Sequence, residues 1–116
     1  MAIRRIVPDI TTEDMVESQR FYGEFLGMEL AMDLGWVRTF VSPSNPTAQI
    51  TLLDQGETAP SPDMSIEVED VASFHAKALE NGFEITYPLT DEPWGVRRFF
   101  VTDPNGKIIN VVQHLS

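Results

Sequence analysis

The sequence of 116 residues contains no cysteine, which excludes disulfide bonds, thiol nucleophiles and cysteine-ligated metals. It also lacks an apolar run long enough to cross a bilayer, and no segment is of low complexity. The two arginines at the start have no apolar run behind them, so no signal peptide is expected. These absences predict a cytoplasmic protein without a membrane partner.

Basic residues are scarce, since 8 Lys and Arg stand against 18 Asp and Glu, for a formal net charge of −10. A surface of this sign repels phosphates, so nucleic acid is not expected as a partner. The same charge concentrates cations near the protein and favours a cationic ligand.

The sequence repeats itself once. Three residues of the first half recur in the second half at an offset of roughly 55 to 58 positions, a fixed period that indicates two copies of one unit. The pairs are Asp14 and Asp70, Gly27 and Gly82, and Trp36 and Trp94. We therefore predict a single domain over residues 1–116, with module one at about 1–57 and module two at about 62–116.

Each half is predicted to run as strand, helix and three strands. The first half gives a strand at 3–10, a helix capped by Thr11 or Thr12 and ended at Gly27, and strands at 28–32, 36–42 and 49–53. A segment at 54–62, rich in Gly, Pro and Ser, is the predicted hinge. The second half gives a strand at 63–68, a helix at 71–81, and strands at 83–87, 96–102 and 107–114.

Two segments carry a family resemblance. Residues 18–27, SQRFYGEFLG, resemble the first helix of the vicinal oxygen chelate superfamily, which contains glyoxalase I, extradiol dioxygenases, fosfomycin resistance enzymes and bleomycin resistance proteins. Residues 93–97, PWGVR, and 100–106, FVTDPNG, are similar to the end of its second module. The resemblance implies an α+β fold of two βαβββ modules whose mixed, barrel-like sheet forms a cup.

The resemblance also implies four positions at which family members usually hold a divalent metal. In this chain they fall on Val7, Thr51, Asp63 and Asn110. Valine has no donor atom, Thr and Asn are weak neutral ligands, and a catalytic ion typically needs three or more protein ligands. We therefore expect no metal and no cofactor.

The alternation of strand side chains gives the predicted cup its lining. If Asp63 faces the cup, then Ser65 and Glu67 do so too, and the first strand adds Asp9. Such an acidic lining suits a cationic or amine-bearing ligand. An acid and base pair formed by Asp63 and Glu67 is a weaker alternative to two solvated or satisfied carboxylates, because few carboxylates have perturbed pKa values.

Aromatic and basic residues add further candidates. Trp36 and Trp94 either stack against a flat ligand or cover the sheet edge. Phe100 and Arg98 share one face of a strand, where Arg98 either binds an anionic group or pairs with Asp63 or Glu67, while Arg97 faces the other way toward a structural partner.

Neither histidine is predicted to be catalytic. His75 lies on the second helix, away from the inferred cup, and His114 lies near the C-terminus, with no partner that the sequence identifies. The catalytic residues of any reaction stay unassigned. The predicted ligand-binding residues are Asp9, Trp36, Thr51, Asp63, Glu67, Trp94, Arg98, Phe100 and Asn110.

Two function classes fit these residues. The first is a metal-free small-molecule-binding protein, similar to the bleomycin resistance proteins, that sequesters a cationic aromatic antibiotic or metabolite. The alternative is a small lyase, isomerase or dioxygenase-like enzyme, so enzyme activity is left open. A homodimer is expected in either case, because a cup lined with Phe100, Leu53 and Val112 would leave an apolar patch on a monomer.

Overall fold

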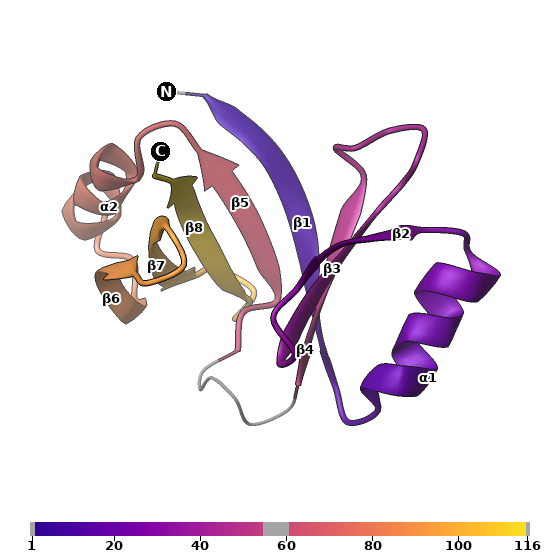
Figure 1. Cartoon of the computed structure of the whole chain (residues 1–116). Coiled ribbons are helices and arrows are strands. Elements are labelled where there is room, and N and C mark those ends of the chain that lie inside the picture. Colours follow the sequence, from indigo (N-terminus) through magenta and orange to yellow (C-terminus); the bar gives the residue numbers. More distant parts are fainter. Residues whose placement is uncertain (1, 55–60, 116) are drawn as a thin grey trace. The chain divides into compact units, whose positions relative to one another are not determined.

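The structure, a computed structural model, describes residues 2–54 and 61–115 and has the predicted mixed α+β class. The elements are β1 (Ile3–Thr12), α1 (Met15–Gln19), η1 (Arg20–Phe25), β2 (Glu29–Asp33), β3 (Val37–Val41), β4 (Gln49–Asp54), β5 (Met64–Val68), α2 (Val71–Glu80), β6 (Ile85–Glu92), β7 (Val96–Thr102) and β8 (Ile108–His114). Figure 1 shows them along the chain.

The chain forms two compact units. Unit 1 consists of Met1–Ile6 and Pro62–Ser116, and unit 2 consists of Val7–Ser61. Strand β1 contributes its first residues to unit 1 and the rest to unit 2. The predicted hinge falls for the greater part on residues 55–60, which lie outside the described residues.

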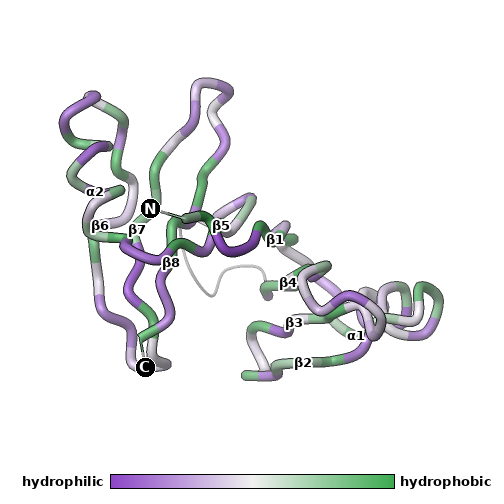
Figure 2. The backbone as a smooth tube through the Cα atoms, turned by 90° about the horizontal axis from the view of Figure 1, so that it is seen from above, coloured by the Kyte–Doolittle hydropathy of each residue, from purple (hydrophilic) through white to green (hydrophobic). Residues whose placement is uncertain are grey.

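The sheet of unit 1 has the order β1, β5, β8, β7, β6, in which β5 runs parallel to β8 and the strands from β8 to β6 are antiparallel. Helix α2 covers one face of this sheet (Figures 1 and 2). The core between helix and sheet is formed by Val68, Val71, Ala78, Phe99 and Val111. As predicted, the helix is followed by Gly82, which has a positive φ of 71°.

Strand β6 differs from the prediction. It begins at Ile85 and continues to Glu92, five residues past the expected end at 87. The register shifts on both sides of Tyr87, and this irregularity accommodates Pro88, which has no N–H to donate to a ladder. The extension places Glu92 inside the sheet, and this matters for the site described below.

The sheet of unit 2 has the order β2, β3, β4, β1, with β1 parallel to β4 and the other pairs antiparallel. The predicted helix cap at Thr11 or Thr12 is wrong, because β1 extends through Thr12. Asp14 caps the helix instead, since its carboxylate accepts a hydrogen bond from the Glu17 N–H at 3.0 Å. The helix then changes from α1 to the π-helical η1 and is followed by Gly27, with a φ of 77°.

The helix of unit 2 does not bury its apolar residues. None of residues 15–25 is buried, and Phe21, Phe25 and Leu26 are 50%, 73% and 53% exposed. Figure 2 shows these hydrophobic stretches along the helix. The helical spacing of apolar residues predicted the helix correctly, but these residues are not buried against the sheet.

The exposed apolar patch expected in the cup is not present at the predicted residues. Phe100, Leu53 and Val112 are only 1%, 7% and 8% exposed within the chain. These three residues therefore do not supply the exposed apolar surface from which a dimer was expected. None of the helices formed by the described residues is long and apolar enough to cross a membrane.

Candidate functional site

The sheet face of unit 1 opposite α2 carries most of the predicted residues of this unit. In the strand register Ser65 and Phe100 both lie beside Asn110, while Glu67 and Arg98 both lie beside Val112. Neighbouring residues across a sheet point to the same side, so these side chains share one face, which we call the site face. Ser65 and Glu67 share one face as predicted, since the residues that alternate with them, Ile66 and Val68, pack in the core on the other face.

An aromatic cluster surrounds Arg98 on the site face. The Arg98 guanidinium carbon lies 5.2 Å from the ring centres of Tyr87 and Trp94 and 4.9 Å from that of Phe100. Tyr87 and Phe100 also contact each other, with ring centres 4.8 Å apart. A guanidinium within about 6 Å of an aromatic ring is attracted by its quadrupole. The cluster therefore holds Trp94, which is 42% exposed, against a fixed cation.

The acidic partner of Arg98 is Glu92, not Asp63 or Glu67 as the sequence suggested. Oε2 of Glu92 lies 2.7 Å from Nη2 of Arg98 and accepts hydrogen bonds from its Nε and from the Tyr87 hydroxyl, both at 2.8 Å. The two charged side chains are 12% and 8% exposed, so the pair is largely desolvated. Sequence reasoning missed Glu92 because it ended β6 at residue 87. The available signal was the Pro-Trp-Gly turn at 93–95, which joins the two strands as a hairpin.

Asn110 presents a buried acceptor. Its Nδ2 donates a hydrogen bond of 2.9 Å to the Ser65 hydroxyl, and the residue is 7% exposed. Its Oδ1 is buried and has no hydrogen-bond partner among the residues that the structure describes. Because buried polar atoms are nearly always paired, this oxygen is an unsatisfied acceptor on the site face.

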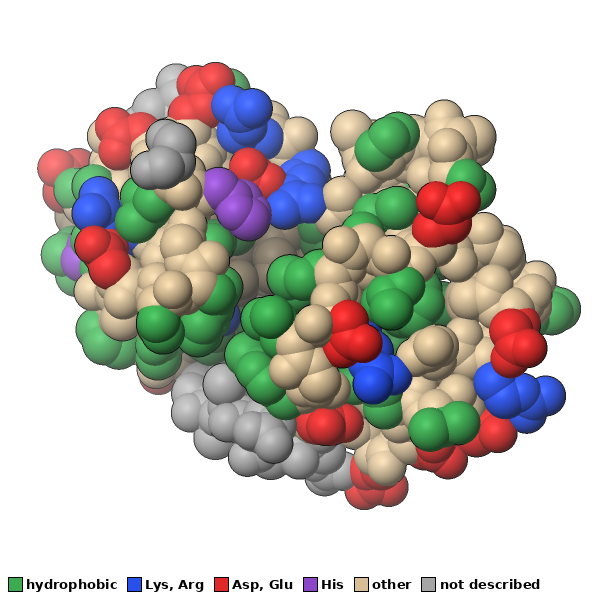
Figure 3. All heavy atoms as spheres, in the orientation of Figure 1, with side chains coloured by type: hydrophobic (Ala, Val, Ile, Leu, Met, Phe, Trp, Pro, Cys, Tyr) green, Lys and Arg blue, Asp and Glu red, His purple; other side chains and the backbone are tan. Residues whose placement is uncertain are grey.

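Glu67 belongs to a compact charge cluster. Nε of Arg5 donates a short hydrogen bond to Oε1 of Glu67, and Nε of Arg4 lies 3.6 Å from Oε2. Nε2 of His114 lies 3.0 Å from Nη2 of Arg5 and 3.9 Å from Oε1 of Glu67. Figure 3 shows a histidine beside acidic and basic side chains on the molecular surface. The Glu67 carboxylate, expected to attract a cationic ligand, is thus compensated by two arginines.

Asp63 has a structural contact. It is exposed and directly precedes β5, whereas the prediction placed it in the strand. Its Oδ2 accepts a hydrogen bond from the Ile108 N–H at 2.9 Å, and its own N–H donates to the Ile108 carbonyl at 2.8 Å. These bonds join the starts of β5 and β8.

The other three predicted residues lie in unit 2. Thr51 lies beside Asp9 in the parallel pair of β4 and β1, and its hydroxyl is 3.0 Å from that of Thr39. Trp36 is half-buried before β3, and its carbonyl accepts a hydrogen bond from the Asp54 N–H at 2.9 Å. The two tryptophans therefore belong to different units.

The four family metal positions do not fit a divalent ion. Val7 is a buried aliphatic residue, the oxygens of Thr51 and Asp63 contact other protein groups, and Asn110 offers a single neutral oxygen. The described residues contain no group of three or more His, Asp or Glu side chains that could hold a metal ion.

Two further predictions concern residues outside the site face. Arg97 pairs with Asp91 through bonds of 2.5 and 3.0 Å, as predicted for a structural pair. Their hydrogen bond lowers the pKa of Asp91 and raises the pKa of Arg97. His75 on α2 packs with its ring centre 5.0 Å from that of Phe99, which confirms that it is a helix residue away from the site face.

Comparison with known proteins gives one family. The family model described as Glyoxalase/Bleomycin resistance protein/Dioxygenase superfamily matches residues 3–111. The chain has no significant sequence match among curated proteins.

Three solved structures show the same fold. The NAD-dependent benzaldehyde dehydrogenase of Legionella pneumophila is 18% identical, with a TM-score of 0.77 and coverage of 94% of this chain and 98% of that one. A glyoxalase/bleomycin resistance protein/dioxygenase superfamily member of Vibrio splendidus 12B01 is 18% identical, with a TM-score of 0.75 and coverage of 97% and 99%. The methylmalonyl-CoA epimerase of Mycobacterium tuberculosis is 18% identical, with a TM-score of 0.71 and coverage of 98% and 88%. Identities this low carry the fold and not the activity.

Proposed function

Because the chain belongs to the glyoxalase/bleomycin resistance protein/dioxygenase superfamily, we propose that it is a metal-free protein that binds an aromatic small molecule on the site face of unit 1. The observation that carries this proposal is the buried Oδ1 of Asn110, which lacks a partner among the described residues, on the same face as Trp94 and its guanidinium. A ligand that donates one hydrogen bond and offers one flat apolar surface satisfies both features.

The aromatic part of the ligand is supported by Trp94. Its indole is 42% exposed and lies over Arg98, whose position is fixed by Glu92 and by Phe100. A stacking surface that is already held in place loses little conformational entropy on binding. The family scaffold serves binding proteins as well as enzymes, so a role in sequestering an antibiotic or metabolite needs no covalent step.

The charge proposed for the ligand depends on the local ion pairs of the site face and on the net charge of the whole chain. On the site face, Glu67 and Glu92 are both compensated by arginine, so neither is a ready counter-ion. At long range the net charge of −10 still attracts cations. We therefore propose an alkylamine that carries an aromatic ring. Its ammonium group donates to Asn110, and its attraction to the protein weakens with salt.

The test uses 2-phenylethylamine as the probe and 3-phenylpropionate as its anionic counterpart of similar size. Isothermal titration calorimetry gives the affinity, and the side-chain NH2 signals of Asn110 in NMR show whether the probe binds at the site face. We expect the amine to bind more tightly at Asn110, and Asn110→Ala and Trp94→Ala each to weaken it about tenfold, consistent with a buried hydrogen bond or a stacked ring. Asn105→Ala, in the exposed turn before β8, is the matched control. Unchanged binding in Asn110→Ala, or tighter binding of the anion at Asn110, would reject the proposal.

We also propose a homodimer, and the residues that support it lie in unit 2. Phe21, Phe25 and Leu26 are exposed on the helix, and apolar side chains gathered on one element are typical of protein interfaces. Analytical ultracentrifugation is the measurement, with Phe25→Glu as the variant expected to dissociate the dimer. A monomer of 13.0 kDa at high micromolar concentration would contradict it.

A second candidate function is a small lyase, isomerase or dioxygenase-like enzyme. One observation favours it, namely that the Glu67 side chain is only 13% exposed and has beside it His114, whose imidazole is able to hold and move a proton. Deuterium exchange at the carbon next to the carbonyl of an aryl ketone probe, followed by NMR, tests it. Exchange that Glu67→Gln abolishes would support an enzyme, and the absence of exchange above the buffer rate would count against proton abstraction by this group.

A further inference from the structure

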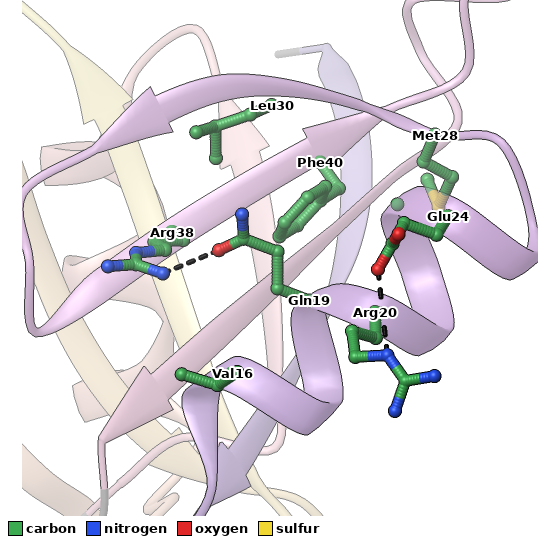
Figure 4. A pocket seen from close by; sticks show the side chains of 9 residues that line it. Val16, Gln19, Arg20, Glu24, Met28, Leu30, Arg38 and Phe40 are labelled. Carbon is green, nitrogen blue, oxygen red and sulfur yellow. Dashed lines mark hydrogen bonds and ion pairs between the residues drawn. The ribbon is translucent and has the colours of Figure 1, made fainter.

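Unit 2 contains a pocket of about 500 Å³ between its helix and its sheet. Figure 4 shows it from close by, with side chains from the helix on one side and from β2 and β3 on the other. The lining residues are Val16, Gln19, Arg20, Gly23, Glu24, Met28, Leu30, Arg38 and Phe40. This volume lies in the range of small-molecule sites, which are typically about 300–1,000 Å³.

The pocket adjoins a place where the helix approaches the sheet closely, at Gly23. Gly23 stands opposite Phe40, and a Cβ atom at Gly23 would lie 3.5 Å from Cε1 of the phenylalanine, which is an ordinary contact distance, so glycine leaves room for a methyl group at this point. The same stretch is π-helical, with the Leu26 N–H donating to the Phe21 carbonyl at 3.0 Å. Single π-helical turns are rare and are found frequently at functional sites. Both features belong to the segment that lines the pocket.

The polar groups of the pocket lie at two places, the exposed pair of Arg20 and Glu24 on the helix and the half-buried Arg38 on β3. Its Nη1 donates to Oε1 of Gln19 at 2.5 Å, and its Nε donates to Oδ1 of Asp33 at 3.1 Å. The Gln19 oxygen faces Arg38, so its NH2 group points toward the space between Leu30 and Phe40 (Figure 4). This end of the pocket therefore offers hydrogen-bond donors, from a guanidinium and an amide, beside an apolar wall.

The charge of unit 2 limits which acceptor can use these donors. Arg38 already has a carboxylate partner in Asp33, and unit 2 contains nine Asp and Glu against two arginines. An anion would be repelled by this excess, and the carboxylates that a cation would use, Glu24 and Asp33, already pair with Arg20 and Arg38. An uncharged acceptor such as a carbonyl oxygen fits both conditions.

We propose that this pocket binds an uncharged apolar molecule that carries one carbonyl group. The carbonyl accepts hydrogen bonds from Gln19 and Arg38, and the apolar body packs on Phe40, Met28 and Leu30. This site lies wholly within unit 2 and is independent of the amine site proposed for unit 1.

The first experiment compares three probes of equal chain length, 2-octanone, octanoate and octylamine. Binding is followed by NMR at the backbone amides of Met28, Leu30 and Arg38 in the unmodified protein. We expect 2-octanone to shift these amides with an affinity at least fivefold above that of either charged probe, while the amides of Ile66 and Val111 in unit 1 stay unchanged. Equal or tighter binding of octanoate, or shifts confined to unit 1, would overturn the proposal.

Two variants test the geometry, each with a matched control. Gly23→Leu places a side chain in the pocket and is expected to weaken 2-octanone at least tenfold, whereas Ala76→Leu on the exposed side of α2 leaves it unchanged. Arg38→Gln removes the guanidinium and is expected to weaken the ketone about fivefold, whereas Arg97→Gln, at the exposed pair of unit 1, has no effect. Undiminished ketone binding in Gly23→Leu would reject the site. Asn110→Ala is expected to leave the ketone unaffected, so the two ligand proposals fail independently.

Discussion

The helices of the two units begin in the same way and end up in different environments. Asp14 and Asp70 cap them with nearly identical backbone angles, φ −136° and ψ 87° against φ −139° and ψ 87°. Helix α2 then runs regularly to Glu80 and buries Val71 and Ala78. The helix of unit 2 becomes π-helical after five residues and buries none of its side chains. A cap therefore determines where a helix begins, while tertiary packing determines whether its side chains are buried against the sheet.

The units also differ in how their charges are compensated. Each contains nine Asp and Glu, but unit 1 has six Lys and Arg and unit 2 has two. Unit 1 uses arginines to pair acids on its site face, such as Arg98 with Glu92. Most of the net charge therefore comes from unit 2, and the site face of unit 1 is locally balanced.

The largest effect is expected from the cores. Phe99 is 1% exposed in a closed core, and Phe99→Ala should lower the free energy of unfolding by about 3–5 kcal/mol. Phe40 is 2% exposed, but its ring borders the pocket, so Phe40→Ala should cost at least about 1 kcal/mol less because fewer contacts are lost. Urea denaturation of both variants measures the difference. Equal losses would show that the two helices are equally well packed.

Next come the ion pairs. Glu92→Gln leaves the largely buried Arg98 without its counter-charge and should lower the free energy of unfolding by about 3 kcal/mol. Asp33→Asn in unit 2 breaks an exposed pair with Arg38 and should change stability little. Thermal unfolding at low and high salt checks both variants. An equal loss of unfolding free energy in Asp33→Asn and Glu92→Gln would show that burial does not set the contribution of these two ion pairs.

A smaller effect of opposite sign is expected in the helix of unit 2. Gly23 has room for a methyl group, and Gly23→Ala should raise the free energy of unfolding by about 0.5–1 kcal/mol by reducing the freedom of the unfolded chain. Ala76→Gly in α2 is the reverse change and should lower it by a similar amount. Chemical denaturation gives both values. A destabilised Gly23→Ala would mean that the π-helical turn depends on glycine.

The smallest effect concerns pH. Hydrogen bonds from the Ser73 hydroxyl and N–H lower the pKa of Asp70, and the Gly35 N–H, followed by Arg38, lowers the pKa of Asp33. Because both folded pKa values are depressed, the associated stability is complete above the usual Asp pKa of about 3.9 and is lost as the pH falls through the folded values. Asp70→Asn and Asp33→Asn should each flatten the acid limb of the stability curve. Carbon-13 titration of the carboxyl groups provides the direct check, and a pKa at or above the usual value would refute the prediction for that residue.

Much of the fold was predictable from local signals. The order of strands and helices, the ends of both helices at Gly27 and Gly82, and the turn before β8 follow from periodicity and from residues that tolerate special backbone angles. The cap at Asp14 was missed because Thr12 is also a good cap residue and only the length of β1 distinguishes them. The Asp70 position, at the same place in the repeat, was the signal that could have corrected it.

The candidate site was predictable only in part. Strand alternation correctly placed Glu67, Arg98 and Phe100 with Asn110 on one face. It could not assign their partners, because Glu92 reaches Arg98 across an irregular stretch of β6 and Arg5 reaches Glu67 from a segment 62 residues away in sequence. Contacts of this kind depend on strand register and on which distant segments of the chain come together, and no local sequence pattern encodes either.

The sequence by itself determined the family, the α+β class, the repeated order of elements and the overall negative charge, since all of these depend on residue type and spacing. The tertiary structure alone decided which carboxylates are compensated, that Phe100 and Val112 are buried, and that one helix is seated while the other leaves a pocket. The physical reason is that spacing fixes which side of an element a residue occupies, whereas burial and pairing depend on how closely two elements approach each other.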